Sequence, residues 1–182
     1  GKKLVLMLSA SPPGVRTLDL GGNEFWVRSS DELVQMLSGI PPGVRVLDLQ
    51  DNRLVHEVDS RGKLEYRDVR ELLRIIAVIP HSVVDLDLGG NDLKDKTAHE
   101  CAQILRAISS EVVMLGLGDN DFFEKSGIEL AEMLAAIPPG VRTLDLRENK
   151  FNKKSGAELE QMMAAIPPSV ISLDLSSNEL DG

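Results

Sequence analysis

Residues 141–151 read VRTLDLRENKF, a stretch in which leucines flank an aspartate and an asparagine follows. The same pattern occurs six times, and its asparagines are Asn23, Asn52, Asn91, Asn120, Asn149 and Asn178. Successive asparagines are 29 residues apart, except that 39 residues separate Asn52 from Asn91. A repeat of fixed length is the signature of a solenoid, in which each unit packs against its neighbours. The second repeat therefore carries an insertion of 10 residues.

Each repeat has two halves with different hydrophobic periods. In the quoted stretch Leu144 and Leu146 flank Asp145, an alternation typical of a short strand with one exposed face. The other half has apolar residues at i, i+3, i+4 and i+7, the spacing of one helix face. In one copy these are Leu130, Met133, Leu134 and Ile137. Every repeat is therefore predicted to be a strand followed by a helix.

The helix boundaries are also visible in the sequence. A hydroxyl or carboxylate residue three positions before a glutamate predicts a helix start, because the pair can cap the free amides of the first turn. These starts are Ser29, Asp68, Thr97, Ser126 and Ser155. Proline, as at Pro138 and Pro139, predicts where a helix ends, since it lacks the amide donor. At the beginning of the chain Leu4, Met7 and Leu8 fit the apolar helix face, so the chain is expected to open inside a helix.

Stacking such units buries their apolar faces between a parallel sheet and a row of helices. The pattern L-x-x-L-x-L-x-x-N-x-L, filled here by Val141, Leu144, Leu146, Asn149 and Phe151, resembles that of leucine-rich repeat proteins. The helical second half and the 29-residue period resemble their ribonuclease-inhibitor-like subclass. The double proline before the strand, in IPPGVRTLDL (residues 137–146), is similar to leucine-rich repeat effectors of intracellular bacteria such as Legionella.

The resemblance implies an α/β leucine-rich-repeat solenoid, a horseshoe with a parallel concave sheet and outer helices. It also implies that the asparagines bond the turn backbone of neighbouring repeats. Residues 1–182 are expected to form a single repeat domain. Neither end shows the polar capping unit that solenoids usually carry, so we expect an excerpt of a longer protein.

Composition and motifs exclude several classes of function. With 29 acidic and 20 basic residues the net charge is -9, the wrong sign for nucleic acid or an anionic membrane. His56, His81 and His99 share no metal-ligand spacing and are expected at the surface, while Cys101 replaces a helix-face leucine and is expected to be buried. No catalytic or phosphate-binding motif stands out. We therefore expect no enzyme activity, metal or cofactor in this segment.

Aspartate recurs between the two strand leucines. It stands there in five repeats, as Asp19, Asp48, Asp87, Asp145 and Asp174, and Gly116 stands there in the remaining one. Because side chains alternate across a strand and strands lie about 4.8 Å apart, the sequence predicts a column of carboxylates on the concave face. Unit charges at that spacing repel by roughly 1 kcal/mol in water. Two interpretations stay open: an acidic groove for a basic protein surface, or a polar residue common in this motif without a binding role.

Positions that differ between repeats are further candidates for partner binding. They are Val46, Asp85 and Met114 on the concave face, Arg147 beyond a strand, and Arg61 in the insertion. Residues 55–66 hold a turn-like Asp-Ser-Arg-Gly between apolar residues, compatible with a small hairpin. This insertion is either part of a binding face or a surface loop without a role.

Three arginines, Arg16, Arg45 and Arg142, precede strands. They either pair with neighbouring acids or form a solvated charge pattern.

The resemblance implies a non-enzymatic scaffold that binds a partner protein on its concave face and rim. If the effector resemblance holds, the partner is a host protein and the chain acts in the host cytosol after secretion; otherwise a cytoplasmic monomer is expected. One alternative is the substrate-recognition region of a larger enzyme whose catalytic domain lies outside residues 1–182. Another is a structural spacer with no partner.

Overall fold

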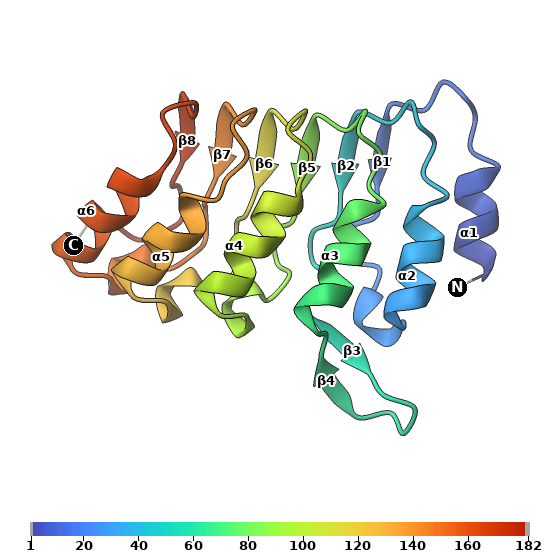
Figure 1. Ribbon diagram of the computed structural model, residues 1–182, viewed down its shortest axis with the longest axis horizontal. Helices are drawn as coiled ribbons and strands as arrows, with labels where there is room; N and C mark the ends of the chain where they lie inside the picture. Colours follow the sequence, from blue (N-terminus) through green and yellow to red (C-terminus); the bar gives the residue numbers. More distant parts are fainter. Residues whose placement is uncertain (1, 181–182) are drawn as a thin grey trace.

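The structure is a computed structural model that describes residues 2–180. Within them, six short strands form one parallel sheet in the order β1-β2-β5-β6-β7-β8, which is the order of the repeats. These strands are β1 (Thr17–Asp19), β2 (Val46–Asp48), β5 (Asp85–Asp87), β6 (Met114–Gly116), β7 (Thr143–Asp145) and β8 (Ser172–Asp174). They stand in a row along one side of the molecule, and the helices run along the other (Figure 1). The predicted solenoid with outer helices is confirmed, and we call the sheet face away from the helices the concave face.

The helices follow the strands in every complete repeat. They are α1 (Lys2–Ser9), α2 (Ser30–Leu37), α3 (Val69–Ala77), α4 (Ala98–Ala107), α5 (Gly127–Leu134) and α6 (Gly156–Ala165), and short 3-10 turns η1 (Phe25–Val27), η2 (Leu93–Asp95), η3 (Phe122–Glu124) and η4 (Phe151–Lys153) precede four of them. Leucines such as Leu47 and Leu49 are fully buried between sheet and helices. Burying one such side chain stabilises the fold by about 1.5–3 kcal/mol.

All five predicted caps are present as complete capping boxes. At the last of them, the backbone amide and the hydroxyl of Ser155 donate to Glu158, and together with Lys154 they lower the pKa of Glu158 to about 2. The prediction that proline ends the helices is wrong for α4, which stops at Ala107 although no proline follows it.

One expectation for the first helix is also wrong. Leu8 is buried as expected, but Met7 is 67% exposed. The side chain of Leu4 lies outside the described residues. At this end of the row of helices α1 packs against α2.

The motif asparagines form the predicted ladder. The Oδ1 atom of Asn120 accepts hydrogen bonds from the amides of Asn91 and Leu93 in the preceding repeat, at 3.1 Å each. Its Nδ2 atom donates to the carbonyl oxygens of Leu88 and Leu117 at 3.2 Å. Five of these asparagines are buried, and each of the five satisfies backbone atoms that would otherwise lack partners: Asn52, Asn91, Asn120, Asn149 and Asn178.

A second ladder, made of basic side chains, joins the helix starts. The residue before each cap is basic: Arg28, Arg67, Lys96, Lys125 and Lys154. The Nζ atom of Lys96 donates to the carbonyl oxygen of Arg67, and that of Lys125 donates to the carbonyl oxygen of Lys96. Lys96 and Lys125 are buried with these contacts. Basic side chains therefore bond successive repeats on the helix side of the asparagines.

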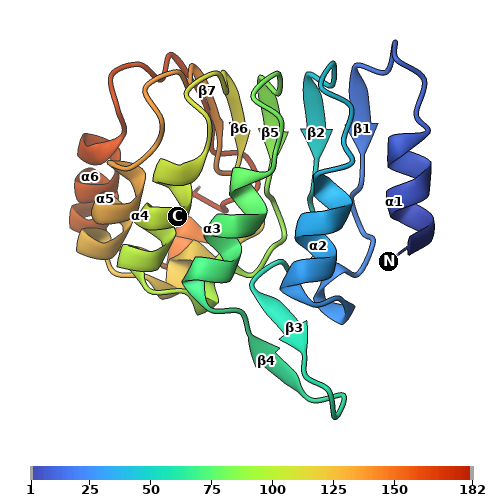
Figure 2. The same cartoon turned by 45° about the vertical axis from the view of Figure 1, so that its right-hand side comes forward.

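The insertion is a hairpin, as predicted. Its strands β3 (His56–Val58) and β4 (Leu64–Tyr66) pair antiparallel, and Gly62 takes a positive φ of 80° in the turn. Both views show it projecting beyond the helices, away from the sheet (Figures 1 and 2). Arg67, at its base, is completely buried and donates to Leu54 O, Ser30 Oγ, Glu57 Oε2, Phe25 O and Arg28 O. The hairpin is thereby held firmly to the first repeat.

Candidate functional site

The aspartates lie in register across the concave face. The strand pairing places Asp19 beside Asp48, Asp48 beside Asp87, and Asp145 beside Asp174. Gly116 separates Asp87 from Asp145. The predicted column of carboxylates, broken once, is therefore present, although this geometry alone does not decide between its two interpretations.

Each of these aspartates also has a local role that the sequence reading missed. The Oδ1 atom of Asp87 accepts a hydrogen bond from the Gly89 amide at 2.8 Å, and Asp48 accepts one from the Gln50 amide at 2.9 Å. The other three do the same with the residue two positions on: Asp19 with Gly21, Asp145 with Arg147, and Asp174 with Ser176. Aspartate thus closes the turn after every strand that carries it. The negative charge is not needed for that bond, since an amide oxygen can also accept it.

The break in the column gives the neighbouring Asp87 carboxylate more room. A side chain at position 116 would place its Cβ atom 2.5 Å from Oδ1 of Asp87 and 2.7 Å from its Cγ. Glycine therefore makes the room in which the Asp87 carboxylate lies. Around it is a hollow of about 230 Å³, lined by Asp85, Asp87, Met114, Leu115, Gly116, Thr143 and Asp145.

Charge is most crowded at the middle of the concave face. Burial raises the pKa of Asp87. The hydrogen bond from the Gly89 amide lowers this pKa, and the nearby charge of Asp48 raises it further. Burial, followed by repulsion from Asp48, also raises the pKa of Asp85. At the end of the column, in contrast, hydrogen bonds from Ser176 lower the pKa of Asp174. On the concave face, Asp85 and Asp87 of the third repeat are therefore the carboxylates that gain most from a nearby cation.

A second hollow, of about 140 Å³, lies next to this centre on the rim formed by the turns. It is lined by Gln50, Asp51, Asp87, Gly89, Gly90, Gly118, Asp119, Arg147 and Glu148. Burial and then Glu148 raise the pKa of Asp119. Arg147 is the basic residue of this lining, and its Nε atom lies 3.1 Å from Oδ2 of Asp145. The rim thus extends the acidic centre, with one arginine already paired to the column.

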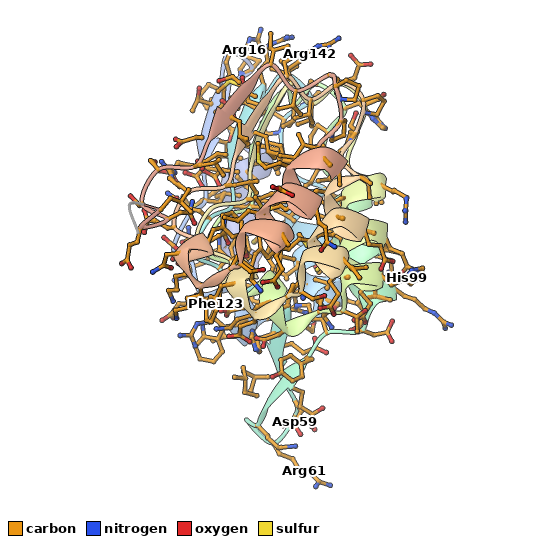
Figure 3. The ribbon with its side chains drawn as sticks, turned by 90° about the vertical axis from the view of Figure 1, so that its left-hand side faces the viewer. Arg16, Asp59, Arg61, His99, Phe123 and Arg142 are labelled. Carbon is orange, nitrogen blue, oxygen red and sulfur yellow. The ribbon has the colours of Figure 1, made fainter. Side chains whose placement is uncertain are left out.

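The other predicted contact residues divide between two places. Val46, Asp85 and Met114 occupy equivalent positions on adjacent strands of the concave face, and Met114 is 45% exposed. Arg61 lies at the tip of the hairpin, far from the sheet (Figure 3). The structure brings every predicted partner-binding residue except Arg61 onto the concave face or its rim.

Of the two interpretations of the arginines before the strands, the structure favours the solvated one: Arg16, Arg45 and Arg142 are exposed, and no ion pair to any of them is found among residues 2–180. Arg16 and Arg142 have an additional contact, since they donate to the carbonyl oxygens of Gly43 and Ser169, each 27 residues on, at 3.1 Å. Figure 3 shows both at the same end of the molecule. The reason is that the next turn of the solenoid brings that carbonyl within reach.

His56 was expected at the surface but is 8% exposed. Its Nδ1 atom lies 3.4 Å from Oδ2 of Asp92 and its Nε2 atom 3.4 Å from Oδ2 of Asp95. The base of the hairpin packs it against the turn of the following repeat. His99, in contrast, is exposed on the helix side (Figure 3). Cys101 is buried as predicted, and this burial raises the pKa of its thiol to about 11.

Two further findings concern residues 2–180 alone. Among them, no group of three or more histidine, cysteine, aspartate or glutamate side chains is arranged to hold a metal ion. No helix in the described part of the chain is long and apolar enough to cross a bilayer.

No protein-family model and no curated protein matches the chain. Among solved structures it is similar to the leucine-rich repeat-containing protein LegL7 from Legionella pneumophila, with 39% identity and a TM-score of 0.87. The match covers 97% of this chain and 52% of that one, so the chain spans about half the length of LegL7 as solved. The tropomodulin C-terminal domain from Caenorhabditis elegans, 12% identical with a TM-score of 0.55 over 92% of each chain, shares the fold alone. From its six repeats, its parallel sheet and this likeness, the chain is a leucine-rich repeat protein of the Legionella type.

Proposed function

We propose that this chain is a non-enzymatic scaffold that binds a basic surface of a partner protein on its concave face and rim. The observation that carries the proposal is the crowded acidic centre around Met114, where Asp85 and Asp87 have raised pKa values. A lysine or arginine of a partner placed there would stabilise the charged form of both carboxylates, and the exposed Met114 would add apolar contact.

The likeness to a Legionella protein supports a further part of the proposal: the partner is a protein of a host cell, which the chain meets as a monomer in the host cytosol. Charge complementarity of this kind raises association rates and selects against acidic partners. We therefore expect binding that weakens as salt is added.

The experiment is affinity capture from a host-cell lysate with two matched variants. Asp48→Asn with Asp87→Asn removes two charges from the centre but leaves an oxygen to accept the turn amides. Glu111→Gln with Glu160→Gln removes two charges at exposed positions outside the concave face. The proposal predicts that recovery of the partner falls about tenfold with the first pair and stays unchanged with the second, a difference of roughly 1.4 kcal/mol. Equal recovery with both pairs would refute it.

A further inference from the structure

The outer edge of β4 has backbone groups without partners. Asp59 donates its amide to Lys63 O at 2.9 Å, and Arg67 donates its amide to Val55 O at 2.8 Å. In an antiparallel pair, residues whose backbones face the other strand alternate with residues whose backbones face away. Leu64 and Tyr66 are therefore the residues of β4 that face away, and within residues 2–180 no hydrogen bond to either amide is found.

The same residues carry an apolar surface. Leu64 is 45% exposed and Tyr66 is 60% exposed. Both lie on one face of the hairpin with Val58 and His56, and the rings of His56 and Tyr66 are 5.0 Å apart. Glu57 and Glu65 are opposite each other on the other face. An edge strand with free amides and exposed apolar side chains is a template for another strand.

The hairpin is held ready for such a contact. Arg67 donates to five acceptors at its base, and three of them, Ser30 Oγ, Phe25 O and Arg28 O, belong to the first repeat. At the other end, Asp59 accepts the amides of Arg61 and Lys63 at 2.8 and 2.9 Å, which closes the turn. The hairpin projects clear of the helices (Figure 2), and all three residues of β4 are exposed, although the Nζ atom of Lys96 lies 5.9 Å from the centroid of the Tyr66 ring. A preorganised edge binds with a smaller loss of conformational entropy.

We propose that the outer edge of β4 binds an extended segment of a partner protein, which adds a third strand to the hairpin. The segment has apolar residues at alternate positions, beside Leu64 and Tyr66, and an acidic residue beside Arg61. The bound segment is expected to carry an acidic residue because Arg61 is exposed and has no acidic partner among the described residues. Lys63, in contrast, is paired with Glu65 at 3.2 Å. This inference rests on the proposed role as a protein-binding scaffold but uses a different surface.

The test begins with selection of peptides of about ten residues from a displayed library on the whole 182-residue chain. The enriched peptides are then synthesised, and their affinities are measured by fluorescence polarisation. Leu64→Pro is the decisive variant, because it removes an amide that faces away from β3 and leaves the hairpin ladder intact. Leu64→Thr is its control, since it keeps the amide and a strand-forming residue.

We expect the selection to enrich alternating apolar peptides that carry an acid. Leu64→Pro should weaken their binding roughly tenfold, and Leu64→Thr less than about threefold. Arg61→Glu should weaken it, whereas Asp48→Asn with Asp87→Asn should leave it unchanged. Hydrogen exchange at the amides of Glu57 and Glu65, which face each other across the β3–β4 pair, checks that the hairpin is still formed in the Leu64→Pro variant.

Four results would overturn the inference. The first is peptides without this pattern, and the second is equal affinity for the wild type and Leu64→Pro. The third is a dimer of the chain that Leu64→Pro dissolves, since the occupant would then be a second copy. Peptides that lose affinity only with Asp48→Asn and Asp87→Asn would also overturn it, while supporting the acidic concave face.

Discussion

The Nη2 atom of Arg67 donates a hydrogen bond to the carbonyl oxygen of Arg28, 39 residues earlier in the chain, at 2.6 Å. The same Nη2 atom also donates to Phe25 O, while Nε donates to Leu54 O and Nη1 donates to Ser30 Oγ and to the Glu57 carboxylate. One buried side chain thus joins the first repeat, the second repeat and the hairpin. The 10-residue insertion leaves this pattern intact. A basic residue stands directly before the helix cap in the first repeat, as Arg28, and again after the insertion, as Arg67.

Arg67→Met should lower the free energy of unfolding by about 3 kcal/mol, because it leaves several buried acceptors and the Glu57 carboxylate without their donor. Urea unfolding monitored by circular dichroism measures the change. Arg70→Met, at an exposed position on α3, is the matched control and should change stability by less than about 0.5 kcal/mol. Equal effects of the two variants would mean that the buried network adds nothing.

The asparagine ladder predicts that the loss of stability on replacing a motif asparagine depends on the position of that asparagine in the array. Asn120→Ala should destabilise by about 2–4 kcal/mol, since it removes bonds to two neighbouring amides and to carbonyls of two repeats. Asn23→Ala should cost much less, because the side chain of Asn23 is bonded only within its own repeat and is exposed. Thermal unfolding of both variants tests this order, and a larger loss for Asn23→Ala would contradict it.

The sequence predicted the fold closely because its signals recur at one spacing. The asparagines, the strand leucines and the helix caps could each be checked against five other copies. The basic residues before the caps recur at the same spacing but were overlooked, since lysine and arginine are rarely buried and a basic position next to a cap resembles ordinary surface charge. That periodicity, read in the same way as the asparagines, would have revealed the second ladder.

Other parts of the site could not be read from the sequence. The burial of His56 depends on where the turn carrying Asp92 and Asp95 packs against the hairpin. The room for Asp87 depends on the closeness of Gly116 on the next strand. Each contact involves a residue, His56 or Gly116, that does not recur at the equivalent positions of the other repeats. Comparing the repeats with one another therefore does not predict them.

Asp87 predicts an unusual dependence of stability on pH. Its pKa is raised in the folded state, so the native protein binds the proton more readily than the unfolded chain, and this contribution to stability is lost as pH rises through the folded pKa. Asp87→Asn should therefore raise the melting temperature at neutral pH by roughly 1–3 °C and have little effect near pH 3. Calorimetry at several pH values measures this.

Asp174→Asn is the control of opposite sign. Bonds from Ser176 lower the pKa of Asp174, so its contribution is present above the unfolded pKa and is lost as pH falls through the folded one. This variant should not raise the melting temperature at neutral pH. A lower melting temperature for Asp87→Asn at neutral pH would show that its charge is compensated in the folded chain.

We propose above that the acidic centre of the concave face binds a basic surface of a partner protein. It is tested most directly by the dissociation constant of a purified captured partner, measured by calorimetry at about 50 mM and about 300 mM salt. We expect Asp48→Asn with Asp87→Asn to raise the dissociation constant about tenfold at low salt and much less at high salt. Identical dissociation constants for the wild type and this variant at low salt would contradict it.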